Sequence, residues 1–211
     1  PGEKKEYYTL SSAQKRLYFL QQMDPNGTTY NISAAWVLEG LLNRNKLEDI
    51  FVRLIKRHES LRTSFVIIGE EPVQRIYDAV EFEIEYKELA AKGREEKKLS
   101  EVFGPTFFQK GGLFDLSQAP LLRVGLKKLE EDRHLLLVDM HHIISDGVST
   151  EILAREFTAF YREEDLAHLS LCYKDFAEWQ NRLKKEESFL RQQKYWETEF
   201  AGEIPVLELP T

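Results

Sequence analysis

One segment of the 211-residue sequence gathers side chains that can do acid–base chemistry. His141 and His142 end an almost wholly apolar run, and Asp146-Gly147 follow shortly afterwards. A histidine that is neutral near physiological pH can take a proton from an amine or a hydroxyl group. Asp146-Gly147 predicts a helix entrance, where backbone N–H groups can face a developing negative charge. Chemistry alone favours a structural alternative, in which a buried histidine pair lies beside a turn that caps a helix.

A metal site is not expected at this motif. Side chains on a strand alternate between its two faces, so the His141 and His142 imidazoles should point apart. The sequence also places no cysteine or acidic cluster beside them that would complete a zinc site. The two histidines are therefore not predicted to share a metal ion.

The segments around the motif predict the elements that position it. Apolar runs at 121–129 and 134–142 flank a polar turn, which predicts an antiparallel hairpin that ends at the histidines. A helix is predicted after Gly147, and two more from Tyr173 and from about Phe189. Trp179, Tyr195 and Trp196 on these last two helices are expected to be core aromatics.

Upstream of the hairpin, strands and helices are predicted to alternate with short turns. Alternating apolar residues predict a strand over 32–40, and helical spacing predicts a helix over 43–58. Ser12 is the expected cap of a first helix, whose apolar residues are Leu17, Phe19, Leu20 and Met23. Shorter elements are three strand-like pieces (63–68, 72–77, 82–86) and a charged helix (93–103). This order predicts a layered α/β or α+β sandwich.

Composition excludes several classes of protein. Lys and Arg number 29 against 36 Asp and Glu, a net charge of −7, which is wrong for a nucleic-acid binder. No apolar run approaches the roughly 18 residues of a membrane helix, and the first residues do not resemble a signal peptide. The single cysteine, Cys172, excludes a disulfide scaffold and suits a reducing compartment, so a cytoplasmic location is expected.

The spacing His-His-x-x-x-Asp-Gly, from His141 to Gly147, resembles the core motif of the condensation domains of nonribosomal peptide synthetases. It is also similar to the active-site motif of the wider superfamily that includes chloramphenicol acetyltransferase. Further segments resemble other signatures of the family, in the family's order: 10–25, 57–65, 114–126, 173–180 and 205–211. The resemblance therefore extends over essentially the whole chain.

The resemblance implies both a fold and an activity. The fold would be a chloramphenicol-acetyltransferase-like lobe, an α/β (α+β) two-layer sandwich with a mixed, largely antiparallel sheet flanked by helices. The activity would be peptide-bond formation between two thioesters, carried on the phosphopantetheine arms of an upstream donor and a downstream acceptor carrier domain. The domain itself would bind no cofactor. An epimerase or another carrier-dependent acyltransferase is the alternative within the family, but Val148-Ser149-Thr150 replace the aromatic residue that epimerases tend to carry there.

The resemblance also assigns roles to the motif residues. His142 would be catalytic, accepting or orienting the proton of the attacking amine. His141 would support the loop by packing and hydrogen bonding, and Asp146 would form a structural salt bridge with Arg62. Gly147 would allow a close approach of substrate or backbone. Ser149 is expected to cap the helix entrance, and the alternative is that it is a polar group near the substrate tunnel. Without the resemblance, Arg62 would be interpreted as a surface arginine at a helix end.

The resemblance matches only the first of the two lobes of a complete condensation domain. We therefore expect residues 1–211 to be an N-terminal lobe that lacks its C-terminal lobe, as an excised piece of a longer synthetase. The competing hypothesis is that the chain is an inactive structural or binding half, which needs a partner lobe or symmetric self-association for turnover. An exposed apolar face where the second lobe packs would favour self-association.

Overall fold

A hairpin of two long strands forms the centre of the computed structural model, which describes residues 4–88 and 112–203. Its strands, β6 (Leu122–Glu130) and β7 (Arg133–His141), are antiparallel, as predicted. β2 (Asn31–Glu39) pairs antiparallel with the free edge of β7, and β5 (Glu85–Glu88) joins β6 in parallel. The resulting order, β2-β7-β6-β5, is a mixed and largely antiparallel sheet. The predicted strand over 82–86 is therefore shifted toward the C-terminus.

A smaller antiparallel sheet has the order β1-β4-β3. The 3-10 turn η1 (Glu59–Arg62) leads into it, and its strands are β1 (Tyr8–Thr9), β3 (Thr63–Ile68) and β4 (Glu71–Ile76). The two predicted strands over 63–68 and 72–77 are thus a hairpin.

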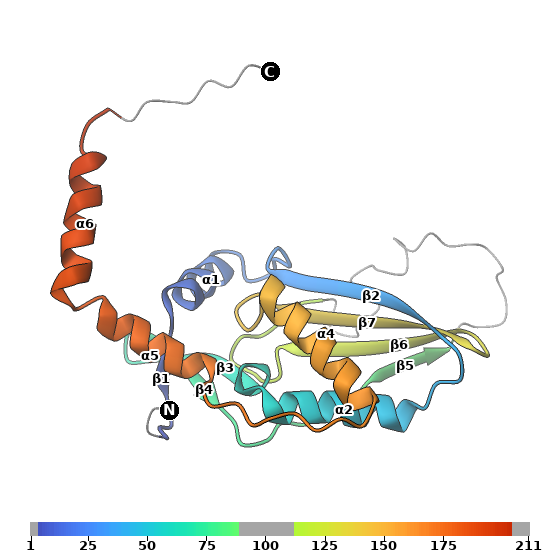
Figure 1. Ribbon diagram of the computed structural model, residues 1–211. Coiled ribbons are helices and arrows are strands. Elements are labelled where there is room, and N and C mark those ends of the chain that lie inside the picture. Colours follow the sequence, from blue (N-terminus) through green and yellow to red (C-terminus); the bar gives the residue numbers. More distant parts are fainter. Residues whose placement is uncertain (1–3, 89–111, 204–211) are drawn as a thin grey trace, which may run out of the picture.

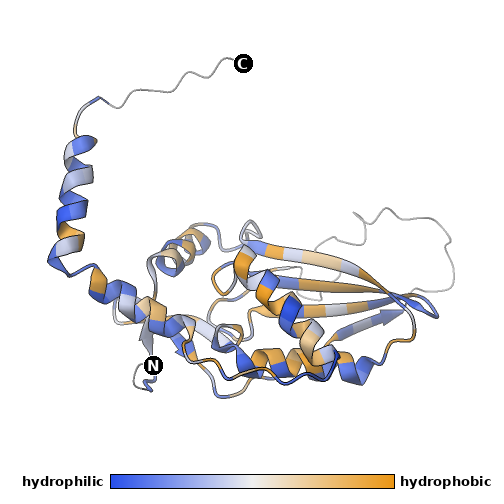
Figure 2. Cartoon of the chain, in the orientation of Figure 1, coloured by the Kyte–Doolittle hydropathy of each residue, from blue (hydrophilic) through white to orange (hydrophobic). Residues whose placement is uncertain are grey.

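Two helices cover one face of the four-stranded sheet, α2 (Arg44–Arg57) and α4 (Gly147–Tyr161) (Figure 1). The apolar stripe of α2 is buried, as its spacing predicts, and Asn43 caps the helix through a bond from the backbone N–H of Lys46. Figure 2 shows hydrophobic residues along the strands and on both helices. The shared core includes Leu122, Val124, Leu126, Leu136, Val138, Met140, Leu54 and Phe160. Burying each of these side chains stabilises the fold by about 1.5–3 kcal/mol.

The first helix, α1 (Ser12–Met23), differs from its prediction in both cap and face. Ser11 rather than Ser12 is the N-cap, because its hydroxyl accepts from the backbone N–H of Gln14 while the Gln14 side chain accepts from the backbone N–H of Ser11. The buried side chains are Gln14, Tyr18 and Gln21, whereas Phe19 and Met23 are 57% and 82% exposed. Leu17 is half-buried against the core, so local hydrophobicity identified the helix but only part of its buried face, whose fully buried side chains are mostly polar.

The last two helices are α5 (Tyr173–Leu183) and α6 (Glu187–Glu199), close to their predicted positions. The expectation that their aromatic residues lie in a core is wrong: Trp179 is 49% exposed, and Tyr195 and Trp196 are each 56% exposed. No residue of α6 is buried, and Figure 1 shows this helix extending away from both sheets. α5 packs against β1 and buries Ala177, but its aromatic side chains lie outside this contact, and α6 has no layer to pack against within the described residues.

Some predicted segments fall outside the part of the chain that the structure describes. These are the charged helix over 93–103 and the signature-like segment over 205–211. Among residues 4–88 and 112–203, no helix is both long enough and apolar enough to cross a membrane.

Candidate active site

The motif forms the connection between the end of β7 and the start of α4. His141 is the last residue of β7, Asp146 is the N-cap of α4, and a tight turn joins them. The backbone N–H of His142 donates to the carbonyl of Tyr30 (2.7 Å), which holds this turn against the start of β2. His141 is only 1% exposed, whereas His142 lies exposed in the turn. The two imidazoles therefore have opposite environments.

His141 is held from two sides beneath the turn. Its Nδ1 accepts from the backbone N–H of Ile143 (3.1 Å), so its Nε2 carries the hydrogen and donates to Oε1 of Gln21 (3.2 Å). The ring also meets Phe114 edge to face, with centroids 6.2 Å apart. Burial, reinforced by the neighbouring His142, lowers the pKa of His141 to about 4. His141 is therefore neutral at physiological pH and supports the turn that carries His142.

Gln21 is a positioning residue that the sequence did not reveal. Its amide nitrogen donates toward the carbonyls of Asp24 (3.3 Å), Pro25 (3.5 Å) and Gly27 (3.4 Å), while its oxygen receives the His141 hydrogen bond. One side chain thus joins the end of α1 to the motif. The only available signal was the spacing of Gln14, Tyr18 and Gln21, which places them on one face of a helix.

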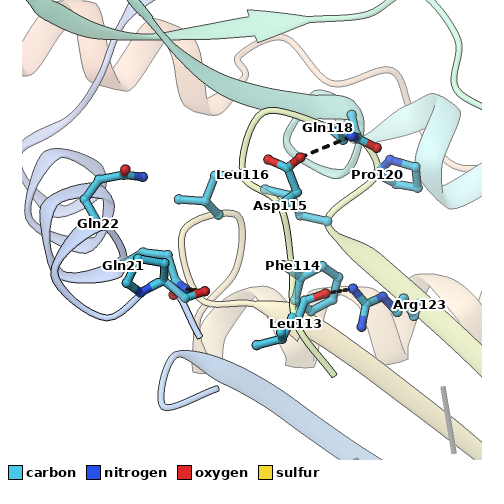
Figure 3. A pocket seen from close by; sticks show the side chains of 12 residues that line it. Gln21, Gln22, Leu113, Phe114, Asp115, Leu116, Gln118, Pro120 and Arg123 are labelled. Atoms are coloured by element: carbon cyan, nitrogen blue, oxygen red, sulfur yellow. Dashed lines mark hydrogen bonds between the residues drawn. The ribbon is translucent and has the colours of Figure 1, made fainter. Parts of the chain in front are cut away.

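A cavity of about 570 Å³ lies beside this support (Figure 3). Gln21 and Gln22 of α1 line one side, and the segment from Leu113 to Arg123 lines the other. The Arg123 guanidinium lies 4.0 Å from the centre of the Phe114 ring and donates to the carbonyl of Leu113. The same Phe114 ring contacts His141, so this wall of the cavity packs against the buried histidine of the motif.

A second polar group lies on the same side of the sheet. Asp139 of β7 accepts from the Ser33 hydroxyl (2.7 Å) and from the Asn31 amide (3.2 Å), and it pairs in register with Arg123. Burial raises the pKa of Asp139 and lowers that of Arg123. These groups fasten β2 to β7 directly before the histidines.

Asp146 acts as the cap of α4. Its Oδ1 accepts from the backbone N–H (2.8 Å) and the hydroxyl (2.6 Å) of Ser149, so Ser149 is the donor and not the predicted cap. These bonds, the side-chain one first, lower the pKa of Asp146 below its ordinary value. Its negative charge therefore occupies the helix entrance, where a second anion would be repelled. This argues against the predicted stabilisation of a developing negative charge there.

The predicted salt bridge between Asp146 and Arg62 is not among the ion pairs of the described residues. Arg62 instead donates to the carbonyl of Tyr77, and its Nη2 lies 3.8 Å from Oε1 of Glu59. The physical reason is that each group already has local partners: Asp146 bonds within its own helix turn, and Arg62 bonds within the η1–β3–β4 region. The structure therefore does not bring these two predicted site residues together.

Gly147 is not required by the protein around it. It does not adopt a left-handed backbone conformation, and a Cβ built on it would meet nothing within 4 Å. The close approach predicted at this residue is thus not made by the chain itself.

The charged residues of the 57–65 signature connect helices. Arg57 Nε and His58 Nε2 lie 2.9 and 2.6 Å from Oε2 of Glu156, a buried carboxylate on α4. Burial raises the pKa of Glu156, but the bonds from His58 and Arg57 outweigh it, so the pKa lies below its ordinary value. Glu59 pairs with Lys174 of α5. Across the described ranges, no group of three or more His, Cys, Asp or Glu side chains is arranged to hold a metal ion.

Comparison with known protein families shows to which family this chain belongs. The family model described as "Condensation domain" matches residues 4–211. The chain belongs to the condensation-domain family. The resemblance to the condensation domains of nonribosomal peptide synthetases is therefore confirmed.

The relatives of this condensation domain are large synthetases. It is 48% identical to gramicidin S synthase 2 of Brevibacillus brevis and 50% identical to tyrocidine synthase 3 of Brevibacillus parabrevis, over all of its 211 residues in each case. It covers only 4% and 3% of these proteins.

Solved structures confirm the fold. The X-domain from teicoplanin biosynthesis is 27% identical, with a TM-score of 0.81 over 100% of this chain and 47% of that one. The starter condensation domain of rhizomide synthetase is 20% identical, with a TM-score of 0.78 over 92% of this chain and 48% of that one. The chain thus spans about half the length of these structures.

Proposed function

We propose that this chain is the N-terminal lobe of a condensation domain that forms peptide bonds between carrier-bound thioesters. The observation that carries the proposal is the presentation of His142. This imidazole is exposed at the end of a buried strand, on a turn that a neutral, fully buried His141 supports. The polar contacts of His141 hold the turn that leaves the His142 side chain exposed.

The reaction requires little more than orientation and one proton transfer. The α-amine of the acceptor aminoacyl group attacks the carbonyl carbon of the donor thioester, so a C–N bond forms and the C–S bond breaks. His142 accepts or orients the proton that the amine loses, and the departing thiolate finally takes up a proton. Both substrates would be held on the phosphopantetheine arms of carrier domains, and the domain would bind no cofactor of its own. Because thioesters are reactive acyl donors, correct positioning supplies much of the rate.

A second lobe would complete the site by packing against the last helices. α5 exposes Tyr173, Phe176 and Trp179, each by at least 41%. α6 exposes Leu190, Tyr195 and Trp196, and its C-cap Phe200 follows them, each more than half exposed. Apolar groups exposed together in this way are typical of an interaction surface. The solved relatives, which are about twice as long as this chain, are consistent with such a partner.

A carrier-to-carrier transfer assay tests the function. A donor-loaded and an acceptor-loaded carrier domain are mixed with the synthetase module that contains this chain, and intact-protein mass spectrometry follows the dipeptidyl carrier. We expect product with the wild type, none above background with His142→Ala, and undiminished product with the control His168→Ala, which alters an exposed histidine outside the motif. Unchanged turnover by His142→Ala refutes the proposal, and inverted donor stereochemistry in a product indicates the epimerase alternative.

The same assay on the isolated chain separates the two hypotheses about its state. Product from the chain alone, together with a dimer in light scattering, means that self-association rebuilds a site. No product from a monomer means that the chain is an inactive half, which needs its second lobe.

A further inference from the structure

Two backbone hydrogen bonds fasten the turn that carries His142 to the strands on either side of β7. Toward β6, the backbone N–H of His141 donates to the carbonyl of Leu121 (3.1 Å). Toward β2, the backbone N–H of His142 donates to the carbonyl of Tyr30 (2.7 Å). The second bond is made by the main chain of His142 itself, so the position of the Tyr30 carbonyl determines where the His142 backbone lies.

The residue that follows Tyr30 is held by its side chain from two directions. Nδ2 of Asn31 donates to the carbonyl of Gly112 (2.6 Å) and to Oδ2 of Asp139 (3.2 Å). A side-chain amide nitrogen carries two hydrogens, so one asparagine can make both bonds at once. Asn31 also pairs in the sheet with His141. This amide therefore joins β2, β7 and the segment before β6 at the place where the motif begins.

Asp139 is the acceptor that anchors this amide. It lies on β7 and is 3% exposed. Its Oδ2 accepts from Asn31, and its Oδ1 accepts from the Ser33 hydroxyl (2.7 Å). Both donors belong to one face of β2, because residues two apart on a strand point to the same side. A buried carboxylate has lost its hydration and depends on such bonds, so Asp139 holds the two donors in fixed places.

The bonds of Asn31 do more than attach the edge strand. β2 pairs with β7 over all nine of its residues, and Ser33 lies directly opposite Asp139. These contacts already attach β2 to the sheet. Asn31 differs from Ser33 because it reaches beyond the strand pair to Gly112 and because it adjoins the Tyr30 carbonyl. Its bonds therefore fix the point from which the backbone of the motif turn is held.

We propose that Asn31 and Asp139 are positioning residues for His142. Their hydrogen bond fixes the start of β2, so that the Tyr30 carbonyl holds the His142 backbone where its imidazole meets the substrate amine. The inference rests on the proposed function, since it takes His142 to be the residue that reacts. The effect on rate is large, because a displacement of about 1 Å at a reacting group can cost about 100-fold. Asn31 and Asp139 exert this effect through the main chain of Tyr30 and His142.

Hydrogen exchange of the His142 backbone amide, followed by NMR, tests this connection without catalysis. Asn31→Ala removes both side-chain bonds, so the His142 N–H should exchange at least about tenfold faster in the 211-residue chain. Ser33→Ala is the matched control, because it removes the other bond to Asp139 and should leave this exchange within about twofold of the wild type. The amide of Val138, in the centre of β7, should be unchanged in both variants.

Three results of this measurement overturn the proposal. One is an unchanged His142 amide in Asn31→Ala. The others are equal acceleration of this amide in Ser33→Ala, and a Val138 amide that accelerates as much as that of His142. Either of these would mean that Asn31 only attaches β2 to the sheet.

Two variants that preserve side-chain shape test the direction of the hydrogen bond, and circular dichroism verifies that each is folded. Asn31→Asp removes the N–H groups and places a second acceptor against Asp139, so it should accelerate the His142 amide as Asn31→Ala does. Asp139→Asn keeps an oxygen that accepts from Asn31, while its new NH₂ group can donate to the Ser33 hydroxyl. It should therefore retain the protection of the His142 amide that Asp139→Ala loses. Equal acceleration in Asp139→Asn and Asp139→Ala contradicts the assignment.

The transfer assay in the complete module connects this position to the rate. Asn31→Ala and Asn31→Asp should lower kcat at least about tenfold and leave the KM of both loaded carriers within about twofold, because only the reacting group is displaced. A raised KM with unchanged kcat counts against the proposal. If His142→Ala abolishes product but Asn31→Ala turns over like the wild type, this inference is wrong and the function stands. If His142→Ala itself turns over normally, the proposed function has failed.

Discussion

Acidification should destabilise this fold through His141, because this buried imidazole must be neutral in the folded chain. Its pKa is about 4 in the folded state and 6.5 when it is free in the unfolded chain. Between pH 6.5 and 4, His141 therefore binds a proton in the unfolded state but stays largely neutral in the folded state. The free energy of unfolding falls by about 1.4 kcal/mol per pH unit, or about 3 kcal/mol in total between pH 6.5 and 4. Above pH 6.5 the contribution of His141 is fully present.

The groups around His141 determine how the measurement must be made. Gln21 and the Ile143 N–H bond its two nitrogens, and Phe114 packs on its ring. Asp139 lies two residues away with a pKa raised by burial, so its protonation favours the folded state and opposes the effect of His141. A difference between two variants removes this opposing contribution, since Asp139 is present in both.

Urea unfolding between pH 8 and 4.5 of the wild type, His141→Asn and His168→Asn tests this reasoning. An asparagine can accept the Ile143 hydrogen bond but does not titrate, so the stability advantage of the wild type over His141→Asn should shrink by about 2–3 kcal/mol across this range. His168 is exposed, so His168→Asn should follow the wild type. Parallel curves for the wild type and His141→Asn would refute a buried neutral histidine.

Two further predictions concern the motif residues around α4. Asp146→Ala removes the helix cap and should lower the free energy of unfolding by about 1 kcal/mol. Asp146 and Arg62 have separate partners. In urea unfolding, the losses caused by Asp146→Ala and Arg62→Ala should therefore add within about 0.5 kcal/mol in the double variant. A larger coupling energy would show that the two side chains interact after all. Gly147→Ala should leave the stability unchanged or raise it by up to about 1 kcal/mol, since the added methyl group meets open space. Any loss of transfer activity in a fully stable Gly147→Ala then reports the approach of substrate, whereas a lower melting temperature would contradict the open environment.

Periodicity in the sequence determined the local elements of this protein. The apolar spacing of 43–58 and the two apolar runs around a polar turn correspond closely to α2 and to the β6–β7 hairpin. These patterns are informative because a strand or helix repeats its buried face over a few residues of one segment. The ordered motifs were likewise sufficient to indicate the family that the comparisons confirm.

Only the tertiary structure decided which partners the functional residues have. Gln21 and His141 are 120 residues apart, and nothing in either segment predicts that an amide on α1 holds the ring beneath the motif. Arg62 and Asp146 have opposite charges, yet each finds closer partners in its own region. The exposure of Trp179 and Trp196 and the cavity beside α1 also depend on how whole elements pack. The physical reason is that periodicity encodes which face of one segment avoids water, whereas contacts, burial of polar groups and empty volume are set by the distances between segments.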